Sequence, residues 1–176
     1  MSPRKKVPSR AEFNVPVEVD NMTIMVCQLR AYSFGDLVEF SRNSLIPFDG
    51  IDDEDDKYDY AENRRLLFFE ILYENNSKKV LNGFPQQWKL SDTDGYVHNH
   101  VLVDYTILET MDIMTLKDVY LNPGRKLRGW IMFEIKNNVV PEFLVFHSSF
   151  FSKRTVDFVI PIKQLDVRVL ENDILH

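Results

Sequence analysis

Hydrophobic and polar residues alternate with a period of two over many short segments of this chain, which predicts β-strands. The clearest alternation covers residues 125–135, where one face carries Leu127, Gly129, Ile131, Phe133 and Ile135 and the other Arg128, Trp130, Met132 and Glu134. Asn122-Pro123-Gly124 comes just before it. Pro presets φ and Gly accepts a positive φ, so a turn is predicted there. A second strand is predicted from Phe143 to Phe146.

Similar patterns predict strands along most of the chain. Residues 12–32 read as a hairpin, because apolar residues alternate on both sides of the Asp20-Asn21 pair. Residues 64–73 are apolar on both faces except for Glu70, as expected of a central strand. Residues 84–90, 101–107 and 155–161 add further strands, with Trp88 pointing inward. Residues 162–175 fit either a last strand or a C-terminal helix.

Turn residues separate these segments about every ten positions, as in all-β sandwiches. We therefore predict an all-β fold, an immunoglobulin-like antiparallel β-sandwich of about seven to nine strands. A short C-terminal helix is the alternative for the last residues. At 176 residues and 20.8 kDa the chain fits a single domain. We place this domain at residues 12–176, after a flexible basic arm at residues 1–11.

The charge of the chain is unevenly distributed. The net charge is −6, and the first ten residues carry +4. Residues 11–176 therefore carry −10, the difference between −6 and +4. A body this acidic repels phosphate backbones, so we do not expect nucleic acid as a partner. There is no run of 18 apolar residues, so no transmembrane helix is expected.

An acidic loop is predicted at residues 49–63. Calcium binds six to eight hard oxygen ligands in flexible geometry, which makes it the natural ion for such a cluster. A solvated loop is the alternative, because Gly50 precedes the acids instead of following at the sixth position of a calcium motif. No other cofactor is expected. The candidate calcium ligands are Asp49, Asp52, Asp53, Glu54, Asp55, Asp56 and Asp59.

Two shorter groups of residues could carry chemistry. Asp92, Asp94 and Gly95 are similar to part of a calcium loop, but a hairpin turn closed by Asx side chains explains them better. His98 and His100 share one face of a strand, and His147 is the third histidine that a zinc site would need. Otherwise these histidines are surface or edge-strand residues.

Other features argue against an enzyme. The single cysteine, Cys27, lies in an apolar run and is expected to be a small buried core residue, without a disulfide. The chain has no Gly-x-Ser-x-Gly elbow. Asp92, Asp94, His98 and His100 are the remaining candidates for a hydrolase, which is the less favoured reading.

Several segments resemble, in order and spacing, the telokin-like immunoglobulin-fold domains of unknown function found in prokaryotic extracellular proteins and lipoproteins. These segments are Leu66–Ser77, Trp88–Gly95, Leu121–Gly124, Arg128–Ile135 and Pro141–Phe146. The resemblance covers roughly residues 12–161. It implies a non-enzymatic module that is secreted or associated with the cell envelope. It brings no catalytic residues, and the family pattern does not require the acidic loop.

The N-terminus bears on localisation. It has a charged start and no apolar h-region behind it, so it does not read as a signal peptide and leaves a cytoplasmic location open. The resemblance implies an extracellular or envelope location instead. We expect a binding or interaction domain whose partner is a protein or a surface ligand. A calcium-stabilised structural module that uses the acidic loop is the alternative.

Overall fold

The computed structural model describes residues 8–33, 63–82, 84–101, 114–116, 120–148, 156–163 and 167–168. These residues form ten strands and one short 3₁₀ helix, η1 (Pro85–Gln87). The strands are β1 (Ser9–Arg10), β2 (Val17–Val19), β3 (Met22–Ser33), β4 (Arg64–Asn75), β5 (Trp88–Asp92), β6 (Val97–Asn99), β7 (Lys126–Lys136), β8 (Pro141–Phe146), β9 (Phe158–Pro161) and β10 (Val167–Arg168). The all-β prediction is confirmed.

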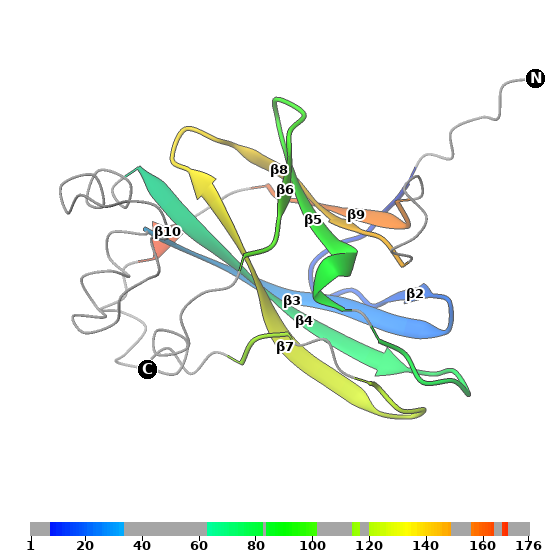
Figure 1. Cartoon of the computed structure of the whole chain (residues 1–176). Helices are drawn as coiled ribbons and strands as arrows, with labels where there is room; N and C mark the ends of the chain where they lie inside the picture. Colours follow the sequence, from blue (N-terminus) through cyan, green and yellow to red (C-terminus); the bar gives the residue numbers. More distant parts are fainter. Residues whose placement is uncertain are drawn as a thin grey trace, which may run out of the picture.

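The strands form two sheets that enclose one core (Figure 1). The first sheet has the order β1-β9-β8-β5-β6. The second has the order β10-β3-β4-β7, and β2 also pairs with β3. Most pairs are antiparallel, while β1 pairs with β9 and β10 with β3 in parallel. The predicted β-sandwich is therefore the observed architecture.

Strand β4 is the central strand that the sequence predicted. It pairs with β3 on one side and with β7 on the other along its whole length. Strand β7 ends the order of its sheet, but short bridges from Val101 to Met132 and from Thr115 to Trp130 cover its outer edge. Its predicted faces are confirmed, because Ile131, Phe133 and Ile135 belong to the core cluster.

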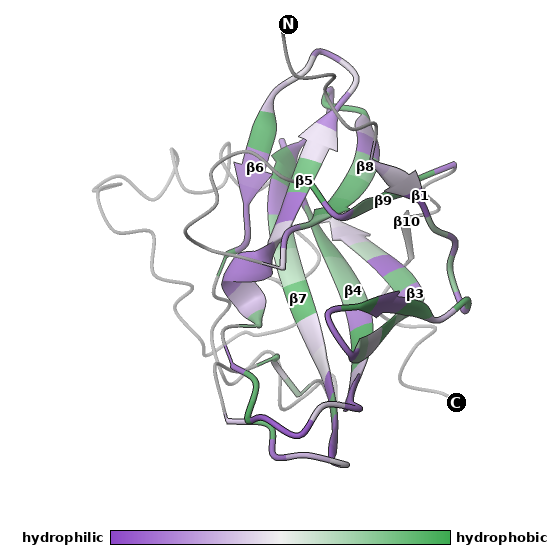
Figure 2. Ribbon diagram, turned by 90° about the vertical axis from the view of Figure 1, so that its right-hand side faces the viewer, coloured by the Kyte–Doolittle hydropathy of each residue, from purple (hydrophilic) through white to green (hydrophobic). Residues whose placement is uncertain are grey.

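The core between the sheets is rich in aromatic residues. Trp88 is fully buried, as predicted, and its Nε1 donates a hydrogen bond of 2.6 Å to the Tyr73 hydroxyl. The Trp88 ring also packs against Phe146 and Phe158, with centroids 4.9 and 5.9 Å away. Figure 2 shows hydrophobic residues along β4, β7 and β8. The bond between Trp88 and Tyr73 links the two sheets through their buried interior.

The predicted turns are confirmed by their backbone angles. Asp20 and Asn21 have φ of 50° and 62°, which is the geometry of a two-residue hairpin turn between β2 and β3. Gly95 and Gly124 have φ of 88° and 72° in the other two turns. The residues that tolerate positive φ are therefore found where the chain reverses.

A β-bulge at Cys27 interrupts β3, which the sequence pattern did not predict. The pairing with β4 shifts register between Val26 and Gln28. Met22, Ile24 and Val26 face the core before the bulge, and Leu29 and Ala31 face it afterwards. The extra residue moves the thiol of Cys27 out of the core, so the expectation of a buried core cysteine is wrong.

Three further differences concern strand limits. Ser9 and Arg10, within the segment predicted as an arm, pair with β9. Residues 12–16 are not a strand, because Asn14 has φ of 61° and the chain there crosses from one sheet to the other. Residues 85–87 form the 3₁₀ helix instead of a strand. Residues 1–7, the acidic loop except Asn63, and residues 169–176 lie outside the described residues.

Within the described part of the chain, no helix has the length and apolar character that crossing a membrane requires.

Candidate functional site

A groove on the flank of the sandwich is the candidate functional site. Its volume is about 670 Å³. Residues 10–14, which lead from β1 toward β2, and residues 161–163, which leave β9, line it together with residues 27–29 of β3. The groove therefore opens where two chain segments leave the first sheet. Its volume lies within the range of about 300–1,000 Å³ found for small-ligand sites.

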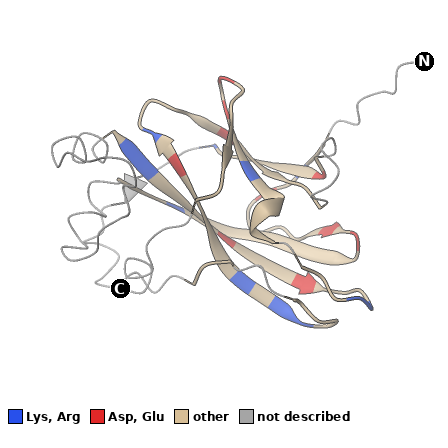
Figure 3. Ribbon diagram, viewed as in Figure 1, with Lys and Arg blue, Asp and Glu red and all other residues tan. Residues whose placement is uncertain are grey.

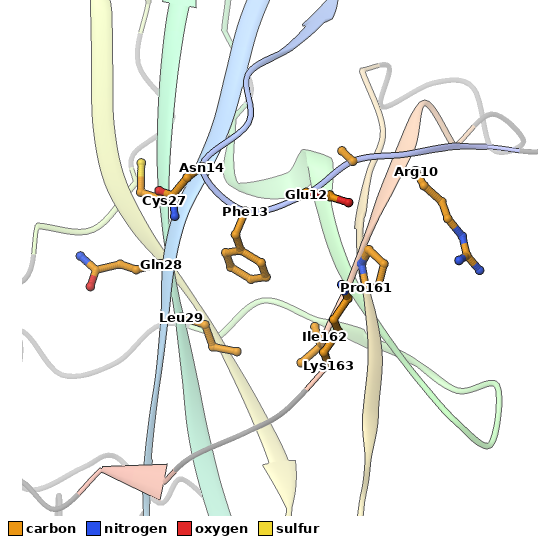
Figure 4. Close-up of a pocket in the computed structure, with 11 residues that line it drawn as sticks. Arg10, Glu12, Phe13, Asn14, Cys27, Gln28, Leu29, Pro161, Ile162 and Lys163 are labelled. Carbon is orange, nitrogen blue, oxygen red and sulfur yellow. The ribbon is translucent and has the colours of Figure 1, made fainter.

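The floor of the groove is apolar and continuous with the core. Phe13, Leu29 and Ile162 line the groove and also pack against the core cluster. In Figure 4 the side chains of Phe13 and Leu29 point into the space between β3 and β9. The Phe13 ring stacks on Phe69 with a centroid distance of 6.5 Å. A ligand in the groove would therefore touch residues that the core already holds in place.

The rim of the groove is polar and exposed. It carries two cations, Arg10 and Lys163, and one carboxylate, Glu12. None of the three belongs to an ion pair with another described residue. The guanidinium of Arg10 lies 5.8 Å from the Phe143 ring centroid and points away from the floor in Figure 4. Lys163 directly follows Ile162 and lines the groove beside it.

Three backbone N–H groups of the groove are already hydrogen-bonded. The N–H of Ala11 donates to the Val159 carbonyl at 2.9 Å, and that of Ile162 donates to the Glu142 carbonyl at 2.9 Å. The N–H of Asn14 donates to the Val26 carbonyl at 2.8 Å. The two chain segments that frame the groove are thereby fixed to the sheets. They present side chains, not these N–H groups, to a ligand.

Cys27 and Gln28 contribute little side-chain surface to the floor. Figure 4 shows both side chains on the other side of β3 from Phe13. Gln28 Nε2 donates to Glu70 Oε2 at 2.8 Å. Burial raises the pKa of the Cys27 thiol and the Glu70 carboxylate adds to this rise, while Arg128 opposes it. A thiol with a raised pKa is a poor nucleophile at neutral pH.

The face of the second sheet that points away from the core also carries cross-strand ion pairs, visible as neighbouring blue and red segments in Figure 3. The exposed pair Lys126–Glu74 contributes little, commonly about 0–1 kcal/mol, whereas Glu134 and Glu70 in the other two pairs are only 18% and 12% exposed. These pairs explain the polar positions of β4 and β7 without invoking a ligand. The pairs are Arg64–Glu134 at 2.6 Å, Lys126–Glu74 at 3.3 Å and Arg128–Glu70 at 3.5 Å.

Asp92 is the best-satisfied carboxylate at the end of the sandwich. It is 3% exposed, and its Oδ1 accepts hydrogen bonds from the backbone N–H of Asp94 at 3.0 Å and of Tyr96 at 2.8 Å. Its Oδ2 lies 2.9 Å from His98 Nε2. The bond to His98 is the main cause that holds the pKa of Asp92 below its ordinary value, helped by both N–H groups against the effect of burial. This arrangement confirms the predicted hairpin turn.

The structure does not bring the candidate zinc ligands together. Among the described residues, no group of three His, Cys, Asp or Glu side chains could hold a metal ion, and His98, His100 and His147 are all described. Burial and the nearby charge of Lys89 lower the pKa of His100. The candidate calcium ligands lie outside the described residues, so the calcium site stays a prediction. These are Asp49, Asp52, Asp53, Glu54, Asp55, Asp56 and Asp59.

Comparison with protein families assigns the chain to one of them. A family model described as "Domain of unknown function (DUF4352)" matches residues 34–156, more than half of the chain. The chain belongs to the DUF4352 family. The resemblance to a family of unknown function with an immunoglobulin-like sandwich is thereby confirmed. No curated protein matches the chain.

Solved structures share the fold of this DUF4352 member. The secreted protein MPT63 from Mycobacterium tuberculosis has a TM-score of 0.56 and 8% identity, and the match covers 89% of this chain and 98% of that one. The yjhA protein from Bacillus subtilis has a TM-score of 0.54 and 12% identity, covering 86% and 98%. The putative lipoprotein ycdA, also from Bacillus subtilis, has a TM-score of 0.54 and 12% identity, covering 89% of this chain and 40% of that one. At these identities the likeness shows the β-sandwich fold.

Proposed function

We propose that this DUF4352 member is a non-enzymatic binding domain and that the groove on its flank is the ligand site. The observation that carries the proposal is the apolar floor of Phe13, Leu29 and Ile162, which is open to solvent yet anchored in the core. Apolar pockets with a few polar groups around them are the usual form of a ligand site. No enzymatic family is indicated by the comparisons.

The proposal includes a location outside the cytoplasm, in the cell envelope or secreted. Two proteins of the same fold support it, since one is described as secreted and another as a putative lipoprotein. Fractionation of cells that produce the protein from its own gene tests the location. Recovery of the protein only with cytoplasmic markers would contradict this part of the proposal.

A neutral apolar probe tests the ligand site. We expect decanol, titrated into ¹⁵N-labelled protein, to shift the amide signals of Phe13, Leu29 and Ile162 in a saturable way. Signals of the distant hairpin around Gly95 serve as the internal control and should not move. If decanol leaves the groove signals in place, or shifts signals over the whole molecule to the same degree, the groove is not a ligand site.

A further inference from the structure

We propose that the groove selects a small amphipathic anion, with an alkyl or aryl chain on the floor and the charged head beside Lys163. This inference rests on the proposed function and adds the chemical class of the ligand. The floor of Phe13, Leu29, Pro161 and Ile162 suits the apolar chain. The charged head then lies at the polar rim that Arg10, Glu12 and Lys163 form.

The charge of the rim points to an anion. Lys163 is exposed, follows the floor residue Ile162 and forms no ion pair with a described residue. Glu12 comes from the opposite side of the groove and opposes it, while Arg10 adds a second positive charge farther from the floor. The rim therefore carries one net positive charge on a protein whose net charge is −6. A lone ammonium is a point charge, so it attracts a carboxylate or a phosphate head without selecting its geometry.

The hydrogen bonds of the groove point to a small ligand rather than an extended peptide. Peptides that bind by strand addition gain affinity from unpaired main-chain groups. Here the N–H groups of Ala11, Asn14 and Ile162 are already paired with carbonyls of the two sheets. Pro161 has no N–H to offer. With these groups taken, side-chain contacts and rim charge are the main features that a ligand can use, and they suit a compact molecule with one apolar and one charged end.

Three probes with the same chain length test the inference: decanoate, decanol and decyltrimethylammonium, each below its micelle concentration. We expect each probe that binds in the groove to shift the amide signals of Phe13, Leu29 and Ile162. Decanoate should bind about two- to fivefold more tightly than decanol, as an exposed charge pair allows. Decyltrimethylammonium should bind more weakly than decanol. The preference should disappear at about 1 M salt, where the screening length falls to about 3 Å.

Matched variants assign the preference to the rim. Lys163→Gln should remove the advantage of decanoate, and Lys78→Gln, the same change at an exposed lysine outside the groove, should leave it intact. Glu12→Gln should increase decanoate affinity by a similar factor. All three positions are exposed, so melting temperature and circular dichroism should stay unchanged and confirm that the variants fold.

The outcomes separate this inference from the proposed function. The preference for an anion would be refuted if decanoate and decanol bound equally well at the groove, or if the advantage of decanoate survived Lys163→Gln. Either result would leave the groove as a ligand site. If a capped Val-Asp-Val peptide bound more tightly than decanoate, the inference that the ligand is a small molecule and not a peptide would be refuted. Groove signals that respond to none of the probes would overturn both proposals.

Discussion

Gly129 is expected to be the most sensitive glycine of the described structure. A Cβ added there would lie 2.7 Å from Leu116 Cα and 2.8 Å from Leu116 N, where ordinary contacts begin at 3.4 Å. To restore an ordinary contact, the backbone of residue 116 would have to move by about 0.7 Å, the difference between 3.4 and 2.7 Å. Both atoms belong to the main chain, so no side chain can rotate away. Gly129→Ala therefore forces residues 114–116 away from β7.

The magnitude follows from the contacts that this movement disturbs. The N–H of Trp130 donates to the Met114 carbonyl at 2.8 Å, and the N–H of Leu116 donates to the Trp130 carbonyl at 2.7 Å. Loss of each bond costs about 1 kcal/mol. Partial exposure of Leu116, which is buried in the core, adds about 1 kcal/mol. We expect Gly129→Ala to lower the free energy of unfolding by about 3 kcal/mol, or the melting temperature by about 6–12 °C.

Urea denaturation followed by tryptophan fluorescence measures the free energy, and hydrogen exchange at the Leu116 and Trp130 amides locates the damage. Gly124→Ala is the control, because a Cβ there meets nothing within 4 Å although φ is +72°. That backbone strain alone costs about 1 kcal/mol. If Gly129→Ala is no more destabilising than Gly124→Ala, or leaves the Leu116 amide as protected as before, the close approach does not constrain this strand.

Three further predictions test other parts of the structure. Tyr73→Phe removes the acceptor of the buried Trp88 Nε1 and should cost about 1–3 kcal/mol in urea denaturation, whereas Tyr96→Phe at an exposed site should change little; equal effects would contradict the buried bond. Asp92→Asn should lower the melting temperature at pH 7, and the difference from the unchanged protein should shrink below about pH 4. A carboxylate whose folded-state pKa is depressed contributes stability above its unfolded-state pKa. It loses this stability as the pH falls through its folded-state pKa. A difference that does not depend on pH would refute this. Millimolar calcium, but not magnesium, should raise the melting temperature and slow proteolysis of the acidic loop if that loop binds the ion; no effect on either removes the prediction for Asp49, Asp52, Asp53, Glu54, Asp55, Asp56 and Asp59.

The period of two assigned both faces of β7 from the sequence because that strand keeps its register with β4 from Lys126 to Lys136. The same reasoning failed for β3. A bulge adds one residue without changing composition, so the pattern on each side of Cys27 looks regular while the core-facing positions change from even-numbered to odd-numbered residues. Only the pairing partner reveals the shift, and that partner is more than forty residues away in β4.

The turn at Asp92 was predictable from the sequence because its hydrogen bonds are local. Asp92 acts on N–H groups two and four residues ahead, so the signal for its role lies within one short segment. His98 adds a side-chain hydrogen bond to Asp92, and it lies on the paired strand six residues away. Local hydrogen bonds explain Asp92 and Asp94 without a metal. The groove is the opposite case, since its floor combines three segments that carry no motif and meet only in the folded chain.

The bulge and the groove are connected through the pairing of β3. Strand β2 pairs with β3 only up to Ile24, and β10 joins it only at Ala31. The bulge at Cys27 lies between these two points. Beside it, the flank is covered by the crossing that holds Asn14 to the Val26 carbonyl and by the residues that leave β9, not by a regular strand. Phe13 and Ile162 cover the core there without filling the gap, which is why apolar surface reaches solvent at this flank.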